Sequence, residues 1–311
     1  MTSNFERFKG ELDQALGLVE TSEMVKSLEV PQISAPQIVD AESLLARCDQ
    51  ICDSFTSRKP MLRIIHHIAC SGGTLVSKCI SALPNVYLLS EVHPFTELGL
   101  DKNKPKYSPT DIVSLVKYAG VPNSTELAAD LFKSSIKHVD RHVTRYGGTL
   151  VLREHTHADY FTRATIPKSS PLIELLKTDY EIESVFTVRD PLESYTSLQN
   201  NGWLHFEPND FREYCRRLLL CIKQFDRDRV FRYEDFVAEP SLILGQISAK
   251  LQLPFDDGFE DIFGLFKVTG DSGRTSDTIE IKTAKVSEDL LMESKLTDTY
   301  QEFIQYMEQK I

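Results

Sequence analysis

The side chains best suited to chemistry in this sequence follow short apolar runs, at the points where strands of a sheet would end. Glu91 follows one such run and Arg189 another, while Arg153 and His155 follow a third. A carboxylate or an imidazole can take a proton from a hydroxyl group within hydrogen-bonding reach. A guanidinium group binds phosphate-like anions through two parallel hydrogen bonds. Together these residue types predict proton abstraction beside a bound anion.

A glycine-rich stretch between an apolar run and a helical pattern predicts an anion-binding loop. Residues 61–69 are mostly apolar, residues 70–74 read Cys-Ser-Gly-Gly-Thr, and residues 75–80 suit the start of a helix. Backbone N–H groups at a helix N-terminus point at an anion, and the helix dipole favours negative charge there. Glycine lets the backbone approach that anion closely. The candidate anion-binding residues are Ser71, Gly72, Gly73 and Thr74.

The apolar runs themselves predict the elements that position these residues. Strands are predicted at residues 62–69, 85–90, 148–152 and 182–188, with helical patterns at 110–119 and 125–146. Strands that alternate with helices predict a parallel sheet wrapped by helices, a three-layer α/β/α domain. The carboxyl ends of parallel strands face the ligand crevice in such a fold, which would bring the polar residues together. Residues 288–311 predict a terminal amphipathic helix that contributes packing only.

The first 57 residues differ in character from the rest of the chain. They are acidic, their apolar residues recur with helical periodicity, and Pro31 and Pro36 interrupt them. We expect residues 1–57 to form an N-terminal helical extension used for packing or for contact in a homodimer. Residues 58–311 are then the α/β domain.

Composition limits the classes of partner. The chain has 311 residues and a formal net charge of −11, which disfavours nucleic acid or an anionic membrane as the main partner. No apolar run approaches the ~18 residues that a membrane span needs. The six cysteines show no C-x-x-C pair, and Cys48 and Cys52 have no second pair that would complete a zinc pattern. We therefore expect reduced thiols, a cytoplasmic protein and no bound metal.

One segment brings a family resemblance into view. The sequence VFTVRDPLESYTS, with Arg189 at the predicted strand end and Ser197 eight residues later, resembles the 3′-phosphate motif of the PAPS-dependent sulfotransferases. That family has a P-loop-like nucleotide-binding fold and uses 3′-phosphoadenosine 5′-phosphosulfate (PAPS). The spacing has a physical reason, because an arginine that leaves the strand and a serine about two turns into the next helix can reach one phosphate.

Further stretches extend the resemblance over roughly residues 60–280. The loop at 70–74 lies where the family binds the 5′-phosphosulfate, and residues 232–237 (RYEDFV) resemble a late strand and the helix after it. Residues 270–274 resemble the late loop that closes over the 3′-phosphate, which implies nucleotide contacts for Gly273 and Arg274.

The loop departs from the family at one important position. Cys70 stands where the family usually has lysine or arginine, so a cation that would stabilise the transferring sulfuryl group is missing. The sequence offers four substitutes and does not decide among them: Lys78, Arg153, His66 and His67.

Two residues compete for the role of catalytic base. Glu91 lies in Glu-Val-His-Pro-Phe, which resembles the catalytic glutamate of several sulfotransferase branches, and this context favours it. His155 resembles the catalytic histidine of cytosolic members, with Arg153 in place of their lysine. His93 and His157 are interpreted as supporting residues. Trp203, the only tryptophan, has two open interpretations: it is a core residue, or it stacks on the adenine or lines the acceptor pocket.

The resemblance implies transfer of a sulfuryl group from PAPS to a hydroxyl or amine of a small-molecule or carbohydrate acceptor, with PAP as the product. Two alternatives remain open. A nucleotide kinase-like P-loop enzyme is disfavoured because the loop lacks the Gly-Lys-Ser/Thr triplet. A non-catalytic nucleotide-binding protein of the same fold is supported by Cys70 in place of the cation.

Overall fold

The structure is a computed structural model that describes residues 9–10, 12–14, 59–98, 100–101, 103–270, 278–280 and 283–309. Residues 9–10 and 12–14 are helical, and the rest of the predicted N-terminal extension lies outside the described residues. The predicted nucleotide contacts Gly273 and Arg274 also lie outside them. The chain from Lys59 onward forms a compact unit of its own, and the account below concerns that unit.

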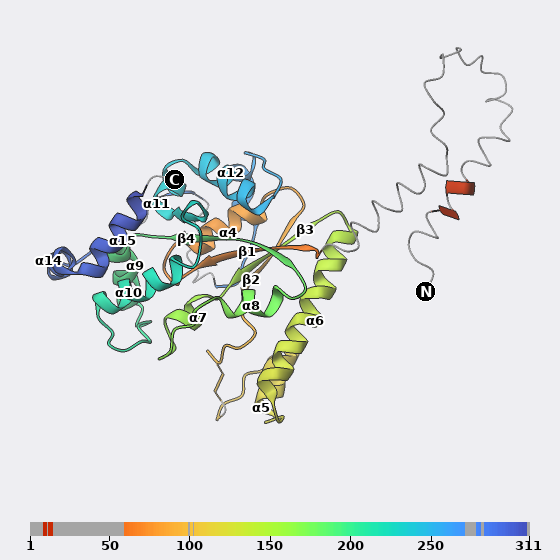
Figure 1. Ribbon diagram of the computed structural model, residues 1–311, viewed down its shortest axis with the longest axis horizontal. Coiled ribbons are helices and arrows are strands. Elements are labelled where there is room, and N and C mark those ends of the chain that lie inside the picture. The colour runs from red at the N-terminus through yellow and green to blue at the C-terminus, as the bar shows by residue number, and fades with distance from the viewer. Residues whose placement is uncertain are drawn as a thin grey trace, which may run out of the picture. The chain divides into compact units, whose positions relative to one another are not determined.

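A parallel sheet forms the centre of this unit (Figure 1). Its strand order is β2-β3-β1-β4-β5. The strands are β1 (Met61–His67), β2 (Val86–Val92), β3 (Thr149–Glu154), β4 (Glu181–Val188) and β5 (Val230–Arg232). Every pairing among them is parallel. The four strands that follow from the apolar runs are present, with bounds that differ from the predicted ones by at most two residues.

Helices rich in apolar residues cover one face of the sheet. They are α4 (Gly73–Ser81), α11 (Tyr233–Ala238), α12 (Pro240–Leu251) and α13 (Phe259–Ile262). Val76 and Ile80 of α4 and Leu244 of α12 pack with Ile65 of β1 in one buried cluster. Burial of each such side chain contributes about 1.5–3 kcal/mol, so this layer holds the start of α4 firmly against the end of β1.

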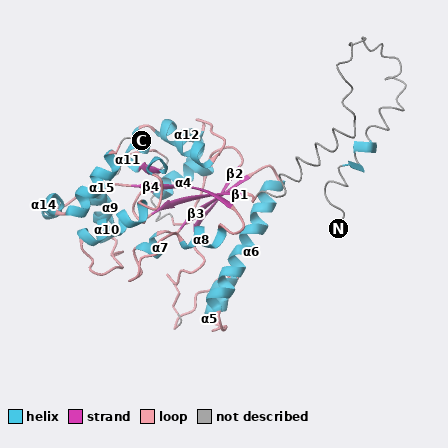
Figure 2. Ribbon diagram, in the orientation of Figure 1, coloured by secondary structure: helices cyan, strands magenta, loops and turns pink. Residues whose placement is uncertain are grey.

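A second set of helices covers the opposite face, as the ribbon coloured by secondary structure shows (Figure 2). It comprises α6 (Ser124–Arg145), α8 (Pro171–Leu176), α9 (Pro191–Asn200), α10 (Phe211–Ile222) and α15 (Asp298–Glu308). Leu62 and Ile64 of β1 face α6 and α8, while Phe186 and Val188 of β4 face α9 and α10. Helices on both faces confirm the predicted three-layer α/β/α architecture.

The remaining elements are short or lie at the edges. They are α5 (Ile112–Tyr118), α7 (His157–Tyr160), α14 (Glu288–Leu296) and the 3₁₀ turns η1 (Arg227–Arg229) and η2 (Phe263–Leu265). The single helix predicted for residues 288–311 is wrong. The chain forms α14 and α15 instead, and Thr297 between them has an extended backbone (φ = −84°, ψ = 106°).

Strand alternation decides which polar residues can meet at the sheet's edge. Successive residues of a strand point to opposite faces. Ile65 pairs with Arg153 across β1 and β3, so His67 and Arg153 lie on the α4 face. His66 and Glu154 consequently lie on the opposite face, where Glu154 Oε2 is 2.5 Å from His66 Nδ1 and both side chains are fully buried.

Candidate active site

The carboxyl ends of β1 to β4 and the start of α4 surround a cavity of about 470 Å³. Most of the residues predicted from the sequence line it: Gly72, Gly73, Thr74, Glu91, Arg153, His155 and Arg189. Ser71 and Ser197 do not line it. The parallel topology therefore brings together residues that are up to 117 positions apart in the sequence (Gly72 to Arg189).

The glycine-rich loop takes the shape of an open cradle. Gly72 precedes α4 with φ = 82°, and no side chain in the described residues caps this N-terminus. The first backbone N–H groups of a helix have no partner within the helix, so α4 offers them to the cavity. A Cβ atom on Gly72 would lie 2.2 Å from ring carbons of Tyr233, and one on Gly73 would lie 2.2 Å from a ring carbon of His67. Both glycines are thus required by close packing.

The hydroxyl groups of this loop do not behave alike. Ser71 is fully buried and its Oγ donates a hydrogen bond to the Ile68 carbonyl at 2.7 Å, so it points away from the cavity. Thr74 Oγ1 lies at the cavity and donates to the Gly270 carbonyl at 3.3 Å. Of the two predicted hydroxyl donors, Thr74 alone lines the cavity.

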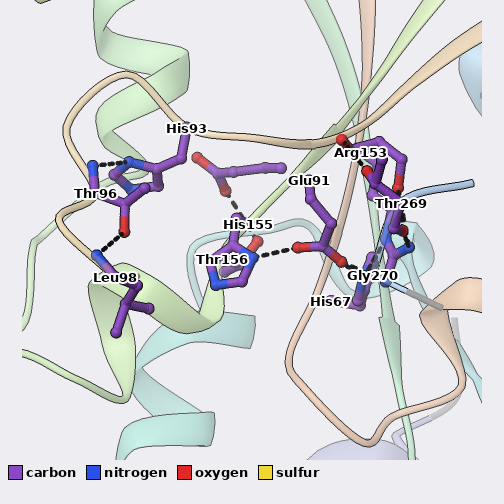
Figure 3. Close-up of polar contacts among 12 residues, drawn as sticks. His67, Glu91, His93, Thr96, Leu98, Arg153, His155, Thr156, Thr269 and Gly270 are labelled. Carbon is purple, nitrogen blue, oxygen red and sulfur yellow. Dashed lines mark hydrogen bonds and ion pairs between the residues drawn. The ribbon is translucent and has the colours of Figure 1, made fainter. Parts of the chain in front are cut away.

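Glu91 lies at the centre of a polar cluster (Figure 3). Its Oε1 is 2.7 Å from Arg153 Nη2, and its Oε2 is hydrogen bonded to Nδ1 of His155. Figure 3 shows His155 on one side of Glu91, with Arg153 and Gly270 on the other. Each carboxylate oxygen is therefore held by a different partner.

The backbone at Glu91 is bent to allow this arrangement. The pairing of β2 with β3 shifts register between Leu89 and Val92, and Glu91 has φ = 60°. A left-handed conformation in a residue other than glycine is strained by about 1–3 kcal/mol, and such strain clusters at functional sites. Gly270 passes so near that a Cβ atom there would lie 2.5 Å from Glu91 Oε1.

Arg153 connects the cluster to its surroundings. Its Nε donates to His67 Nε2 at 2.6 Å, and its Nη1 donates to Ser90 Oγ at 3.0 Å and to the Thr269 carbonyl at 3.1 Å. The guanidinium group is therefore held rigidly, with its charge directed at Glu91.

The surroundings lower the pKa values of two groups in this cluster, Glu91 and His67. Burial alone would raise the pKa of Glu91, but the hydrogen bond to His155 and the nearby His67 and Arg153 outweigh it and hold the pKa well below its usual range. Burial, with the charge of Arg153 in addition, lowers the pKa of His67 to about 4. Glu91 is thus ionised and His67 is neutral at physiological pH.

The four candidate substitutes for the missing cation occupy different places. Arg153, His67 and Lys78 line the cavity, and Lys78 is 3% exposed on α4. His66 does not line it, because strand alternation places it on the opposite face with Glu154. As a neutral ring at physiological pH, His67 supplies no charge, which leaves Lys78 and Arg153.

Arg189 lies just past β4, on the far side of the loop from Glu91. Its Nη2 is 3.1 Å from Glu193 Oε2, its Nη1 donates to the Cys70 carbonyl at 3.4 Å, and its guanidinium carbon is 5.4 Å from the Tyr233 ring centre. It is 8% exposed and lines the cavity. Ser197 lies on α9, the helix that follows.

Several wall residues carried no readable signal in the sequence, whereas Trp203 left two interpretations open. Tyr233, His205 and Glu280 line the cavity, as does Trp203, which is 40% exposed and so is not a core residue. His93, interpreted from the sequence as a supporting residue, does not line the cavity; its Nδ1 accepts from the Thr96 amide at 2.7 Å, and its Nε2 is 2.7 Å from Asp159 Oδ2. Such contacts are made by loops, whose conformation cannot be predicted from hydrophobic periodicity.

Comparison with known proteins identifies the fold. No protein-family profile and no curated protein sequence matches the chain. Among solved structures, it is similar to the sulfotransferase domain from the curacin biosynthetic pathway, with 17% identity and a TM-score of 0.52 over 82% of this chain and 100% of that domain. This protein therefore has the sulfotransferase fold, as the resemblance implied.

Two other solved structures are similar to a smaller degree. The sulfotransferase domain from the Synechococcus PCC 7002 olefin synthase is 17% identical, with a TM-score of 0.42 over 79% of this chain and 96% of that domain. The sulfotransferase from Alicyclobacillus acidocaldarius is 14% identical, with a TM-score of 0.42 over 80% of this chain and 94% of that protein. Within the described residues, no helix is long and apolar enough to cross a membrane.

Proposed function

We propose that this protein is a sulfotransferase that moves a sulfuryl group from PAPS to a hydroxyl or amine of a small-molecule or carbohydrate acceptor. The observation that carries this proposal is the position of the Glu91–Arg153–His155 cluster across one cavity from the glycine-rich loop and Arg189. A proton-accepting group on one side and an anion cradle on the other are what in-line transfer to a hydroxyl requires.

The described residues fit the nucleotide on two counts. The cradle before α4 presents backbone rather than side chains at Gly72 and Gly73, and its helix dipole favours an anion. Arg189 is a buried cation that lines the same cavity, which supports assigning the 3′-phosphate to it. We assign the 5′-phosphosulfate to the loop, with Thr74 as its hydroxyl donor. When bound, PAPS supplies the activated sulfuryl group.

We assign the role of base to His155 and an orienting role to Glu91. Both oxygens of Glu91 are already engaged, and its lowered pKa makes it a weak proton acceptor. Its bond to Nδ1 of His155 fixes the ring and leaves Nε2 to take the acceptor's proton. The same bond stabilises the imidazolium that forms. This assignment reverses the order that the sequence context favoured.

We assign the missing loop cation to Lys78, supported by Arg153. Lys78 is buried at the cavity on the first helix after the loop. Arg153 already faces the carboxylate of Glu91, so its charge is partly balanced. A second cation beside the loop is needed because negative charge builds on the bridging oxygen as the sulfuryl group leaves.

Nucleotide binding and transfer are tested separately. In a thermal-shift assay PAP should raise the melting temperature by several degrees at about 100 times its dissociation constant, equivalent to ~2.7 kcal/mol, while ATP and AMP raise it less. Incubation with ³⁵S-labelled PAPS and fractionated metabolite pools should then label an acceptor. Stabilisation by ATP in place of PAP would indicate a kinase-like enzyme. PAP binding without any labelled product would indicate a nucleotide-binding protein.

A further inference from the structure

His67 is buried at the site, yet it supplies no charge to it. It is the last residue of β1, is 5% exposed, and its ring lies so close to α4 that Gly73 has no room for a Cβ atom. Figure 3 shows His67 and Arg153 on the side of Glu91 opposite to His155. Any contribution of a neutral ring to the chemistry therefore comes through its hydrogen bonds.

The contact with Arg153 fixes which ring nitrogen of His67 carries the proton. Arg153 Nε is 2.6 Å from His67 Nε2. A guanidinium group only donates hydrogen bonds, so Nε2 must accept with its lone pair. Burial and the charge of Arg153 lower the pKa of His67 to about 4, and a neutral imidazole has a single ring proton. That proton is therefore on Nδ1.

The surroundings of His67 Nδ1 are compatible with a proton there. Nδ1 is buried and has no hydrogen-bond partner among the described residues, so no donor competes with the tautomer that Arg153 imposes. Thr187 of β4 pairs in register with His67, and its buried Oγ1 is likewise unpaired in the described part of the chain. A hydroxyl oxygen can accept from an N–H group, so this tautomer has an acceptor on the neighbouring strand.

The bond to His67 determines where the guanidinium group of Arg153 points. With Nε held, Nη2 is 2.7 Å from Glu91 Oε1 and 3.4 Å from Thr74 Oγ1. One nitrogen thus faces both the carboxylate that orients His155 and the hydroxyl group of the loop. Because the guanidinium group is a rigid planar fork, the position of Nε constrains the positions of the other two nitrogens.

We propose, on the basis of the sulfotransferase assignment, that His67 is a positioning residue: as a neutral ring with its proton on Nδ1, it holds Arg153 between the loop and Glu91. Without the Nε2 lone pair, Arg153 is free to turn away from Glu91, which then orients His155 less well. The contribution of His67 depends on one acceptor atom, which distinguishes positioning from packing of the ring.

The first test is an NMR measurement that needs neither nucleotide nor acceptor. Long-range ¹H–¹⁵N correlation spectra at pH 7.0 distinguish a protonated from an unprotonated ring nitrogen. The signals of His67, one of eight histidines, are those missing from the His67 variants. We expect Nδ1 to be protonated and Nε2 unprotonated in the wild type. A proton on Nε2, or on both nitrogens, would overturn the proposal, whether or not every variant folds.

The second test follows the Nε–H group of Arg153, whose signal is assigned by its absence in Arg153→Met. His67→Phe keeps a ring against Gly73 but has no acceptor, whereas His67→Gln offers an amide oxygen in place of Nε2. The Nε–H should exchange with water about tenfold faster in His67→Phe than in the wild type, the worth of one hydrogen bond, and His67→Gln should restore slow exchange. Equal exchange in all three proteins, or equally fast exchange in the two variants, contradicts the proposed hold on Arg153.

Turnover tests whether this positioning matters for transfer. With saturating PAPS and an identified acceptor, His67→Phe should lower kcat by ~10–10²-fold, the effect of a misplaced reacting group, and should change KM for PAPS by no more than about threefold. His67→Gln should recover most of the lost kcat. An unchanged kcat in His67→Phe, or the same loss in both variants, would remove His67 from a positioning role.

The proposed function fails separately, if PAP does not bind the wild-type protein or no acceptor is labelled. The tautomer of His67 and the exchange of the Arg153 Nε–H are measured on the free protein, so both still test whether His67 holds Arg153.

Discussion

The imidazole of His155 and the carboxylate of Glu91 are joined by a hydrogen bond between Nδ1 and Oε2, across the ends of two adjacent strands. The other carboxylate oxygen is held by Arg153. The two candidate bases of the sequence are therefore one unit, in which a fixed carboxylate orients an imidazole that faces the cavity. What distinguishes the two candidates is which of them, Glu91 or His155, receives the acceptor's proton.

Substitutions in this pair should have unequal effects on turnover. His155→Ala removes the proton acceptor and should lower kcat by ~10²–10⁴. Glu91→Gln keeps a hydrogen-bonding side chain and should lower kcat less, by roughly 10–10². The double variant should be no slower than His155→Ala, because residues that act as a unit are not additive. Initial rates with saturating PAPS and an identified acceptor provide the measurement. A larger loss in Glu91→Gln than in His155→Ala would make the carboxylate the base.

Arg189 should decide the affinity for the 3′-phosphate. Arg189→Ala removes a charge-assisted contact worth ~1.5–3 kcal/mol, so the dissociation constant for PAP should rise about 10- to 100-fold. Binding of adenosine 5′-phosphosulfate, which lacks the 3′-phosphate, should change little. Arg212→Ala, which loses only an exposed ion pair with Asp298, is the control and should bind PAP normally. Equal losses for both nucleotides in Arg189→Ala would remove Arg189 from the 3′-phosphate site.

A side chain at Gly72 should destabilise the fold, whether or not an anion is bound. The sequence suggested that a side chain here would occupy the anion's place, but a Cβ atom would first meet the Tyr233 ring at 2.2 Å. Gly120→Ala is a matched control, because Gly120 also has positive φ (67°) and nothing lies within 4 Å of its Cβ position. Both variants bear ~1–2 kcal/mol of backbone strain, and Gly72→Ala adds overpacking of ~1–3 kcal/mol.

The measurement for these glycines is urea denaturation of both variants without nucleotide. Gly72→Ala should be the less stable of the two by the overpacking cost. Equal stability would mean that Tyr233 moves aside at no cost. Because the substitution acts on the fold, loss of nucleotide binding in a Gly72 variant does not by itself locate the phosphate.

The sheet was predictable because its signal is local. Apolar runs bounded by glycine or polar residues mark β1 and β4, and polar residues at their ends follow from the strand order. Alternation within a strand also separates His66 from His67, although the sequence alone does not say which of them faces the loop. That choice depends on which face α4 covers, which is fixed by Ile65 packing against Val76.

Much of the site depends on segments without periodicity. The pairing of β2 shifts register at Glu91, and Gly270, 179 residues further along the chain, passes beside the Glu91 carboxylate. Neither feature leaves a pattern in the sequence. The buried orientation of Ser71 likewise depends on the local turn, whose Ile68 carbonyl takes its hydroxyl hydrogen bond. Residue types therefore indicated the chemistry, while the partners of Glu91 could be identified only from the three-dimensional structure.

Stability should fall as the pH is lowered from about 6.5 towards 4. His67 and His157 have an ordinary pKa of 6.5 when exposed, and burial lowers the pKa to about 4 in His67 and to about 3 in His157. Between these values the unfolded chain binds protons that the folded protein does not, so the free energy of unfolding decreases with falling pH. Each histidine contributes at most ~1.4 kcal/mol per pH unit. Glu91 adds to the loss below about pH 4.5, the ordinary value of its pKa, because its pKa in the folded protein is lowered too.

The measurement is urea denaturation at pH 7.0, 6.0 and 5.0, with the free energy of unfolding extrapolated to water. The wild type should lose stability at each step. His157→Phe lacks one of the two histidines and should lose about half as much between pH 7.0 and 5.0. His142→Phe is the control, because this side chain is exposed on α6, and it should follow the wild type. If His157→Phe and the wild type show the same pH dependence, His157 takes up a proton in the folded protein, which contradicts a buried neutral ring without a charged partner.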